Sequence, residues 1–199
     1  MCRRIALIQG HPDPAGGHFC NALAEAYTAG ARAAGHHVDL IEVAALDVPF
    51  LRSRNALEYD ETPPQIQLAQ QTIAAADHVV VVHPIWNGGA PALLRAFMEQ
   101  TFRPSFIFPG LKPGEHLGFS AAFREQKRLR DKTARVVATM QMPAFVYRWY
   151  FRPHQEASAL RLGGAAPVKE TLIGFVEATD GSKREQWLRR MRILGAEGK

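Results

Sequence analysis

Four valines in succession, at positions 79–82, are followed at once by HPIWNGGAPALLRAF at positions 83–97. A continuous β-branched run favours a strand that is buried on both faces, as in parallel sheets. Pro91 suits the first turn of a helix, so the segment PALLRAF predicts a helix that begins soon after the strand. This order of strand, glycine-containing loop and helix is typical of α/β folds.

The same alternation extends along the chain. Strands are predicted at 4–9, 37–43, 79–84, 133–140 and 168–176, and helices at 19–35, in a segment ending near 76, at 91–102 and at 183–194. This pattern predicts an α/β fold with a five-stranded parallel sheet covered by helices on both faces, the doubly wound arrangement. A chain of 199 residues is expected to form a single domain, 1–199. The stretches 103–131 and 142–164 do not fit the alternation, and long connections of this kind are commonly functional.

The charge of the chain limits its partners. A net charge of +5 and a pI near 9.5 suit anionic partners such as dinucleotides, nucleic acid or a membrane surface. The basic runs 124–135 and 183–192 are interpreted as solvated faces, and no nucleic-acid-binding motif accompanies them, so no nucleic acid partner is expected. No apolar run reaches the roughly 18 residues of a membrane helix and no signal peptide opens the chain, which favours a cytoplasmic protein without an integral membrane segment. Cys2 and Cys20 show neither CxxC nor zinc-ligand spacing, so two free thiols and no metal site are expected.

Three loops are expected to form one binding site. In an open parallel sheet, ligands bind outside the carboxyl ends of the strands, and the loops 10–18, 84–89 and 139–143 each follow a predicted strand. The first loop ends at a helix start, which attracts a phosphate, but its glycines fit neither GxGxxG nor GxxxxGK[ST]. A nicotinamide-only Rossmann domain and an NTPase are therefore disfavoured. His11 and His18 are candidate phosphate contacts, with a plain turn position as the alternative for each.

The second loop combines Trp86 with the paired glycines Gly88 and Gly89. Glycines let the backbone approach a flat ligand closely, and an indole ring can lie against its face. A flavin ring is such a ligand. The alternatives are a core or interface aromatic for Trp86 and a tight strand-to-helix turn for the glycines.

Three motifs together resemble a known family. HPDP after the first strand, HPIWNGGAPALLRAFMEQTF followed by RPSFIF, and TMQMPAFVYRWYFRPH are similar to the NAD(P)H:quinone oxidoreductases of flavodoxin-like fold, the DT-diaphorase group. The resemblance spans nearly the whole chain, from Ile5 to the terminal KREQWLRRMRILG. It implies FAD or FMN as the flavin, NAD(P)H as co-substrate and a quinone-like small molecule as acceptor. It also implies a homodimer whose active site is completed by the partner chain, with the aromatic stretch 145–151 as a contributor.

The resemblance also implies which residues form the site. The cofactor-binding residues would be His11, His18, Phe19 and Cys20 at the phosphate end, Pro84, Ile85, Trp86, Asn87, Gly88 and Gly89 along the ring, and Thr139, Met140 and Gln141 at its other edge. Tyr147 and His154 would be catalytic, because they fall where the family places a tyrosine and a histidine beside the pyrimidine end of the flavin. There a hydroxyl or an imidazolium could stabilise the negative charge that develops near N1 and the C2 carbonyl. The chain departs from the family at HFCN (18–21), which opens the first helix, and at Gln141, where glycine is common.

The hypothesis that follows is a two-step exchange, in which NAD(P)H gives a hydride to flavin N5 and leaves before a quinone is reduced in the same space. A nitroreductase or azoreductase activity stays open, as does a flavin-binding regulatory subunit of a membrane transporter. An electron-carrier flavodoxin is disfavoured because such carriers tend to be acidic, and a hydrolase because GxSxG and HExxH are lacking. FMN versus FAD, NADH versus NADPH, and the physiological acceptor stay open as well.

Overall fold

The structure, a computed structural model, describes residues 2–112, 114, 127–151 and 155–199. Its strands are β1 (Arg4–Gln9), β2 (His37–Glu42), β3 (His78–Pro84), β4 (Thr133–Thr139) and β5 (Val168–Ile173). Its α-helices are α1 (Phe19–Ala33), α2 (Arg54–Glu58), α3 (Pro64–Ala75), α4 (Ala92–Thr101), α5 (Pro104–Ile107), α7 (Ala144–Tyr150), α8 (Gln155–Leu162) and α9 (Gly181–Ala196), and a 3₁₀ turn, η1 (Val43–Ala45), follows β2.

The strands form one five-stranded sheet in the order β2-β1-β3-β4-β5, and every pair is parallel. The predicted α/β class and the doubly wound sheet are therefore confirmed. The strand order reverses beside β1, since β2 lies on one side of β1 and β3 on the other. In this arrangement the carboxyl ends of β1 and β3 border the crevice where ligands bind.

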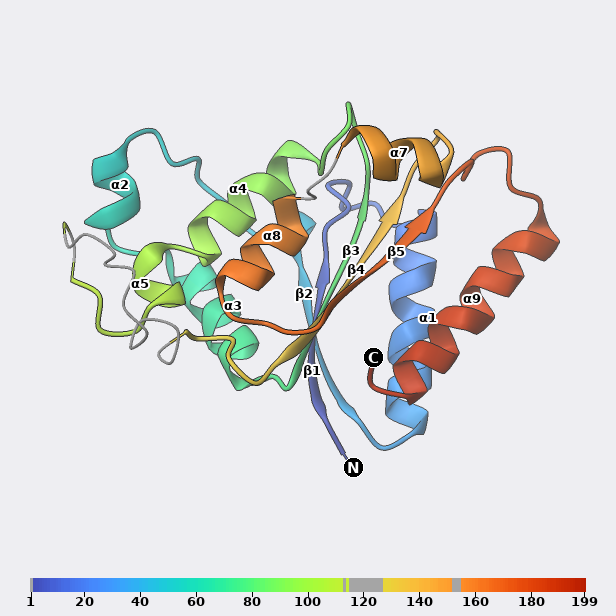
Figure 1. Ribbon diagram of the computed structural model, residues 1–199, viewed down its shortest axis with the longest axis horizontal. Helices are drawn as coiled ribbons and strands as arrows, with labels where there is room; N and C mark the ends of the chain where they lie inside the picture. Colours follow the sequence, from blue (N-terminus) through green and yellow to red (C-terminus); the bar gives the residue numbers. More distant parts are fainter. Residues whose placement is uncertain (1, 113, 115–126, 152–154) are drawn as a thin grey trace.

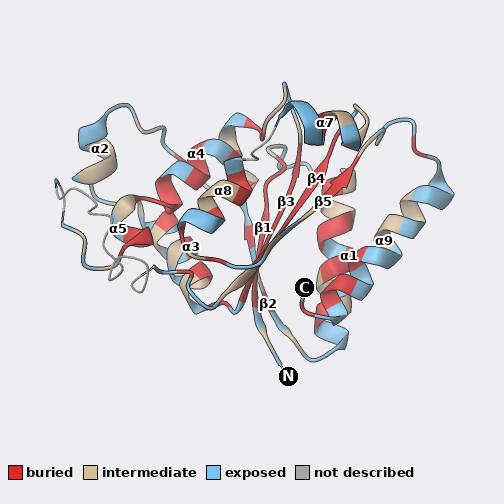
Figure 2. Cartoon of the chain, in the orientation of Figure 1, coloured by how far each residue is buried: buried red, intermediate tan, exposed pale blue. Residues whose placement is uncertain are grey.

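Helices cover both faces of the sheet (Figure 1), with α1 and α9 on one face and α3, α4 and α8 on the other. The valine run shows why both faces must be covered. Val79 and Val81 pack into the core beneath α3 and α4, whereas Val80 and Val82 pack beneath α1 and α9. Every residue of β3 is buried, as expected of a central strand, and Figure 2 shows burial concentrated in the strands and the inner helix faces.

Two glycines bring α1 and α9 into backbone contact. A Cβ on Gly30 would lie 2.0 Å from the carbonyl oxygen of Arg192, and a Cβ on Gly195 would lie 2.0 Å from that of Tyr27. Only a residue without a side chain fits at either position. The two helices are thereby held close to each other.

Some predicted bounds differ from the structure. The fifth strand ends at Ile173 rather than at 176, because Phe175 has a φ of 54° and breaks the extended backbone. A Cβ on Gly174 would lie 2.7 Å from Met142 O, so the chain after β5 runs tightly against the loop after β4. The sequence pattern did not predict α2, α5, α7 or α8, which are between four and eight residues long. The last three of these lie in the two stretches that did not fit the alternation.

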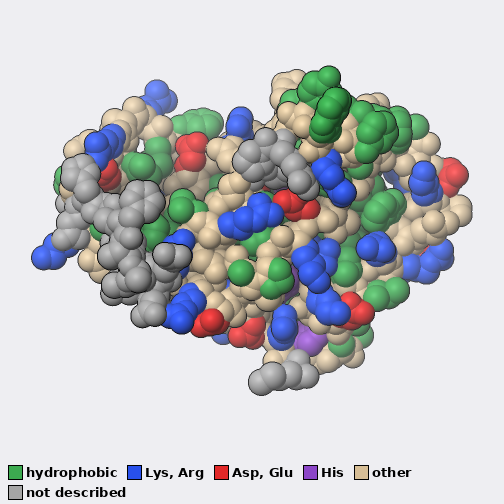
Figure 3. Space-filling view, viewed as in Figure 1, with side chains coloured by type: hydrophobic (Ala, Val, Ile, Leu, Met, Phe, Trp, Pro, Cys, Tyr) green, Lys and Arg blue, Asp and Glu red, His purple; other side chains and the backbone are tan. Residues whose placement is uncertain are grey.

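Exposed aromatic side chains gather at one end of the molecule. Figure 3 shows hydrophobic side chains concentrated around α7 and the neighbouring loop. We define the α7 aromatic patch by Phe145, Trp149, Tyr150 and Phe175, which are 74, 82, 71 and 52% exposed. Among the described helices none has the length and apolar character needed to cross a bilayer.

Candidate functional site

The three loops predicted to form a site do meet at the carboxyl ends of β1, β3 and β4. The Ile85 amide donates to the Thr139 carbonyl oxygen at 2.7 Å, which joins the second loop to the third. Cys20 Sγ lies 3.2 Å from Thr139 Oγ1, which joins the start of α1 to the third loop. The rings of His11 and Trp86 meet edge to face with centroids 6.0 Å apart, which joins the first loop to the second. The three loops therefore lie together as predicted, and their binding of a common ligand stays a prediction.

The first loop is organised by two stacked histidine rings. The rings of His11 and His18 lie nearly parallel with their centroids 3.7 Å apart. Asp13 joins them, because its amide donates to His11 Nδ1 at 3.2 Å and its carboxylate lies 2.8 Å from His18 Nε2. The Gln9 side chain anchors the loop by accepting from the His11 amide at 2.6 Å. Sequence reasoning identified both histidines but missed Asp13 and Gln9.

The pKa values of His11 and Asp13 are both lowered in this loop. Burial lowers the pKa of His11 below its ordinary value, and the neighbouring His18 lowers it further. Because Nδ1 of the neutral His11 ring accepts the Asp13 amide, its proton sits on Nε2, where it is a donor. Asp13 has a lowered pKa because the Ala15 amide and then His18 hydrogen-bond to its carboxylate. The loop therefore offers a neutral N–H donor at His11 beside an ionised carboxylate at Asp13.

The start of α1 presents unpaired backbone donors. The amides of Asn21 and Ala22 bond back to the His18 carbonyl oxygen at 2.9 and 3.2 Å. Those of Phe19 and Cys20 have no acceptor within the residues that the structure describes. Two free N–H groups at the positive end of a 15-residue helix form a favourable place for a phosphate. Of the predicted residues here, Phe19 is half-buried and Cys20 is buried, so their backbone N–H groups are more available to a ligand than their side chains.

The second loop is a two-residue hairpin turn. The Trp86 amide donates to Gly89 O at 2.8 Å and the Gly89 amide donates to Trp86 O at 3.0 Å. The residues between them, Asn87 and Gly88, have φ values of 49° and 80°, the combination that defines a type I′ turn. The turn is therefore formed by Asn87 and Gly88, and not by the predicted pair Gly88 and Gly89. The turn holds Trp86 half-exposed, at 51%, with its indole beside the first loop.

The third loop presents less side-chain surface than the family resemblance implies. Thr139 and Met140 are buried, with exposures of 4 and 2%. Both backbone groups of Met140 are used, since its amide donates to Ile173 and its carbonyl accepts from Val176. Gln141 is exposed, and its side chain donates to Glu177 at 2.5 Å. Gln141 is therefore the predicted residue of this loop whose side chain is most accessible.

Tyr147 lies below the surface on α7. Its side chain is 2% exposed and its ring stacks on Phe151 with centroids 5.4 Å apart. Burial, followed by the carboxylates of Glu156 and Glu170, raises the pKa of Tyr147 to about 12, so its phenol keeps its proton at neutral pH. Phe151 also packs on the second loop, because a Cβ on Gly88 would touch its ring. The other predicted catalytic residue, His154, lies outside the described residues.

These features fit a planar ligand with an anionic tail. An exposed indole beside a hairpin turn provides a flat surface for a ring. The start of α1 provides N–H groups for a phosphate. A flavin mononucleotide has this combination of a flat polar-edged ring and a phosphate, so the residues present fit such a group.

Comparison with known proteins agrees with this geometry. The chain matches a protein-family model described as Flavodoxin_2, flavodoxin-like fold, over residues 3–192. An FMN-dependent NADH:quinone oxidoreductase of Ruegeria pomeroyi is 31% identical over 137 residues, which span 61% of this chain and 66% of that protein. The structure of an NAD(P)H:quinone oxidoreductase from Methanothermobacter marburgensis has a TM-score of 0.76 at 18% identity, with 99% of this chain and 97% of that chain covered. The structure of an FMN-dependent NADH-azoreductase from Bacillus anthracis in complex with FMN has a TM-score of 0.72 at 12% identity, with 99% of each chain covered.

Proposed function

This chain belongs to the Flavodoxin_2 family of flavodoxin-like fold, and on that premise we propose that it is a flavin-dependent NAD(P)H:quinone oxidoreductase that uses FMN. The observation that carries the proposal is the half-exposed Trp86 on its type I′ turn, at the point where three loops meet. The Ruegeria pomeroyi relative, whose name specifies FMN, NADH and a quinone, supports the choice among flavin enzymes.

The cofactor would be held at two ends. The N–H groups of Phe19 and Cys20 would bind its phosphate, with His11 Nε2 as a further donor. Trp86 and the backbone of residues 84–89 would bind its ring. The bound flavin supplies hydride exchange at N5, the step that amino-acid side chains cannot perform.

Two residues are proposed to act beside the flavin ring. Tyr147, whose raised pKa of about 12 keeps its phenol protonated, is proposed as a donor toward the pyrimidine end of the ring. His154 remains a predicted partner in that role. NAD(P)H and the quinone would occupy the open space beside Trp86 one after the other, since both would bind against the same exposed surface.

Steady-state kinetics with matched variants test this proposal. The wild type, loaded with FMN, is expected to oxidise NADH or NADPH rapidly with a soluble benzoquinone and in a ping-pong pattern. Trp86→Ala should bind FMN at least about tenfold more weakly, because it loses an aromatic contact worth about 0.5–1.5 kcal/mol together with its buried area. Phe50→Ala, at a site 61% exposed and far from the three loops in sequence, is the control and should behave as wild type.

Two alternatives would give different results. An azoreductase would show a higher kcat/KM for an azo dye than for any quinone tested. This alternative is considered because one of the similar structures is an azoreductase. A regulatory subunit of a transporter would bind FMN tightly yet turn over negligibly with every acceptor.

We also propose that the protein is cytoplasmic. Recovery of the protein in the membrane fraction of cells would contradict this location.

We propose further that the chain forms a homodimer through the α7 aromatic patch. Phe145, Trp149 and Tyr150 are each more than 70% exposed, and monomeric proteins rarely leave so large an apolar surface in water. The patch adjoins Phe151 and Gly88, so a partner chain seated on it would border the ring position. Light scattering should give a dimer for the wild type and a monomer for Trp149→Glu, while Phe50→Glu stays dimeric. A monomeric wild type would contradict this.

A further inference from the structure

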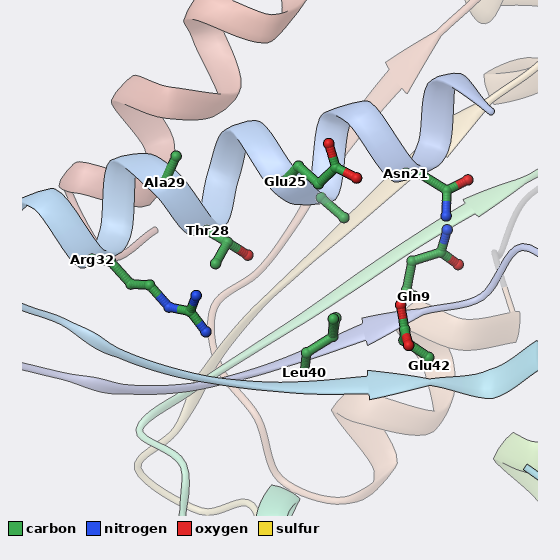
Figure 4. A pocket seen from close by; sticks show the side chains of 9 residues that line it. Gln9, Asn21, Glu25, Thr28, Ala29, Arg32, Leu40 and Glu42 are labelled. Carbon is green, nitrogen blue, oxygen red and sulfur yellow. The ribbon is translucent and has the colours of Figure 1, made fainter. Parts of the chain in front are cut away.

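A groove runs between α1 and the edge strand β2, away from Trp86 and the second loop. Its volume is about 330 Å³, and its lining includes Gln9, Asn21, Thr28, Leu40 and Glu42 (Figure 4). In this groove α1 packs mainly against α9, and Leu40 of β2 is left 49% exposed. Its volume lies at the small end of the range for ligand pockets, roughly 300–1,000 Å³.

Two side-chain amides have fixed orientations at the head of this groove. Gln9 Oε1 accepts from the His11 amide at 2.6 Å, and Asn21 Oδ1 accepts from the His18 amide at 3.2 Å. Since each oxygen is held by a backbone donor, each NH₂ group must point the other way. Figure 4 shows these two amide ends pointing toward one another. Gln9 is only 5% exposed, and its Nε2 has no hydrogen-bond partner within the described residues.

Unpaired acceptors lie in the same groove. Glu42 is the last residue of β2, and its carboxylate has no ion pair among the described residues; the same holds for Glu25 of α1. The one cation of the lining, Arg32, donates to the Val38 carbonyl oxygen at 3.4 Å. The head of the groove therefore offers two amide donors beside a free carboxylate.

This combination selects one chemical group. An ammonium ion would satisfy Glu42 but leave the buried Gln9 donor unpaired, which is costly. An anion would accept from the amides but be repelled by Glu42 and Glu25. A hydroxyl group donates to the carboxylate and accepts from the amides, and it does so without a charge. Two neighbouring hydroxyls match the two amides and the two carboxylate oxygens, while Leu40 and Ala24 offer an apolar wall to the carbon skeleton.

We propose that the groove binds the vicinal diol of a ribose or a related sugar, with Glu42 accepting from the hydroxyls and Gln9 and Asn21 donating to them. The diol can belong to a nucleoside or to a free sugar. Binding at this groove requires none of the contacts assigned to the flavin ring.

Side-chain amide signals in ¹H–¹⁵N spectra of the FMN-saturated protein test the proposal. Adenosine is expected to shift the NH₂ signals of Gln9 and Asn21, whereas 2′,3′-dideoxyadenosine should bind about tenfold or more weakly because it lacks both hydroxyls. A separate titration with D-ribose tells the two sources of the diol apart. If adenosine binds and ribose does not, the ligand is a nucleoside; if ribose binds as well, the sugar itself is recognised. If the protein takes up no FMN, the proposed function fails, yet the same titration of the flavin-free protein still decides about the groove.

Three isosteric variants separate the hydroxyl contacts from the fold. Gln9→Glu and Asn21→Asp keep the oxygens that hold the first loop but remove the NH₂ donors, and Glu42→Gln removes the charge. Each should weaken adenosine about tenfold, whereas Gln186→Glu, on the exposed face of α9, should not. Equal binding of adenosine and its dideoxy analogue, unchanged affinity in all three variants, or no shift up to about 10 mM nucleoside or ribose would overturn the proposal.

Discussion

Replacing Gly88 by alanine tests how the second loop is held. The backbone φ of Gly88 is +80°, and a Cβ there would lie 2.4 Å from Cε1 of Phe151. A side chain in the left-handed region costs about 1–2 kcal/mol, and overpacking costs about 1–3 kcal/mol more. Because the Phe151 ring is 40% exposed and can turn aside, the lower part of that range applies. We expect the free energy of unfolding to fall by about 2–3 kcal/mol.

Gly16→Ala is the matched control. Gly16 has a φ of +71° and no atom within 4 Å of its would-be Cβ, so it carries the backbone strain without the clash and should lose about 1–2 kcal/mol. Urea denaturation of the flavin-free protein measures both losses. In a double-mutant cycle, Phe151→Ala should recover about 1 kcal/mol in the Gly88→Ala background. Equal losses at the two glycines, together with no coupling to Phe151, would refute the contact between the turn and the end of α7.

Other expectations follow from packing and titration. Gly30→Ala should lower the free energy of unfolding by at least about 3 kcal/mol, because its Cβ would meet the Arg192 backbone at 2.0 Å, whereas Gly181→Ala, with open space around it, should not. Burial, then Arg135, lowers the pKa of His78 from 6.5 to about 3. The unfolded chain therefore binds this proton first, so stability is lost as the pH falls below about 6.5, at up to about 1.4 kcal/mol per pH unit. Urea titrations between pH 7 and 5 should show a smaller loss in His78→Gln, and equal slopes would contradict the assignment. Burial raises the pKa of Cys20 to about 11, so a thiol reagent at pH 8 should label one thiol, Cys2, in the native protein and two in urea.

The sequence predicted the sheet well because its signals are local. Each central strand is an apolar run with β-branched residues, and β1 has the predicted bounds, 4–9. The short helices escaped prediction for a physical reason. In the seven residues of α7, aromatic side chains face both the core, as Tyr147 does, and the solvent, as Trp149 does, so no apolar periodicity marks the helix.

The candidate site was predicted by its loops and not by its internal contacts. The dipeptide Asn87-Gly88 is a known signal of a type I′ turn, and it would have identified the hairpin that the Gly88-Gly89 interpretation missed. The stack of His11 on His18 depends on how residues 12–17 fold back, which no local pattern specifies. The buried position of Tyr147 depends likewise on packing between α7 and the sheet.

We propose that a flavin binds where the three loops meet, against Trp86 and the start of α1. The most direct test is the absorption spectrum of the purified protein after incubation with FMN and gel filtration. We expect one equivalent of FMN to elute with each chain, with a yellow band that Trp86→Ala largely loses and Phe50→Ala keeps. A colourless wild type that retains neither FMN nor FAD would contradict the claim.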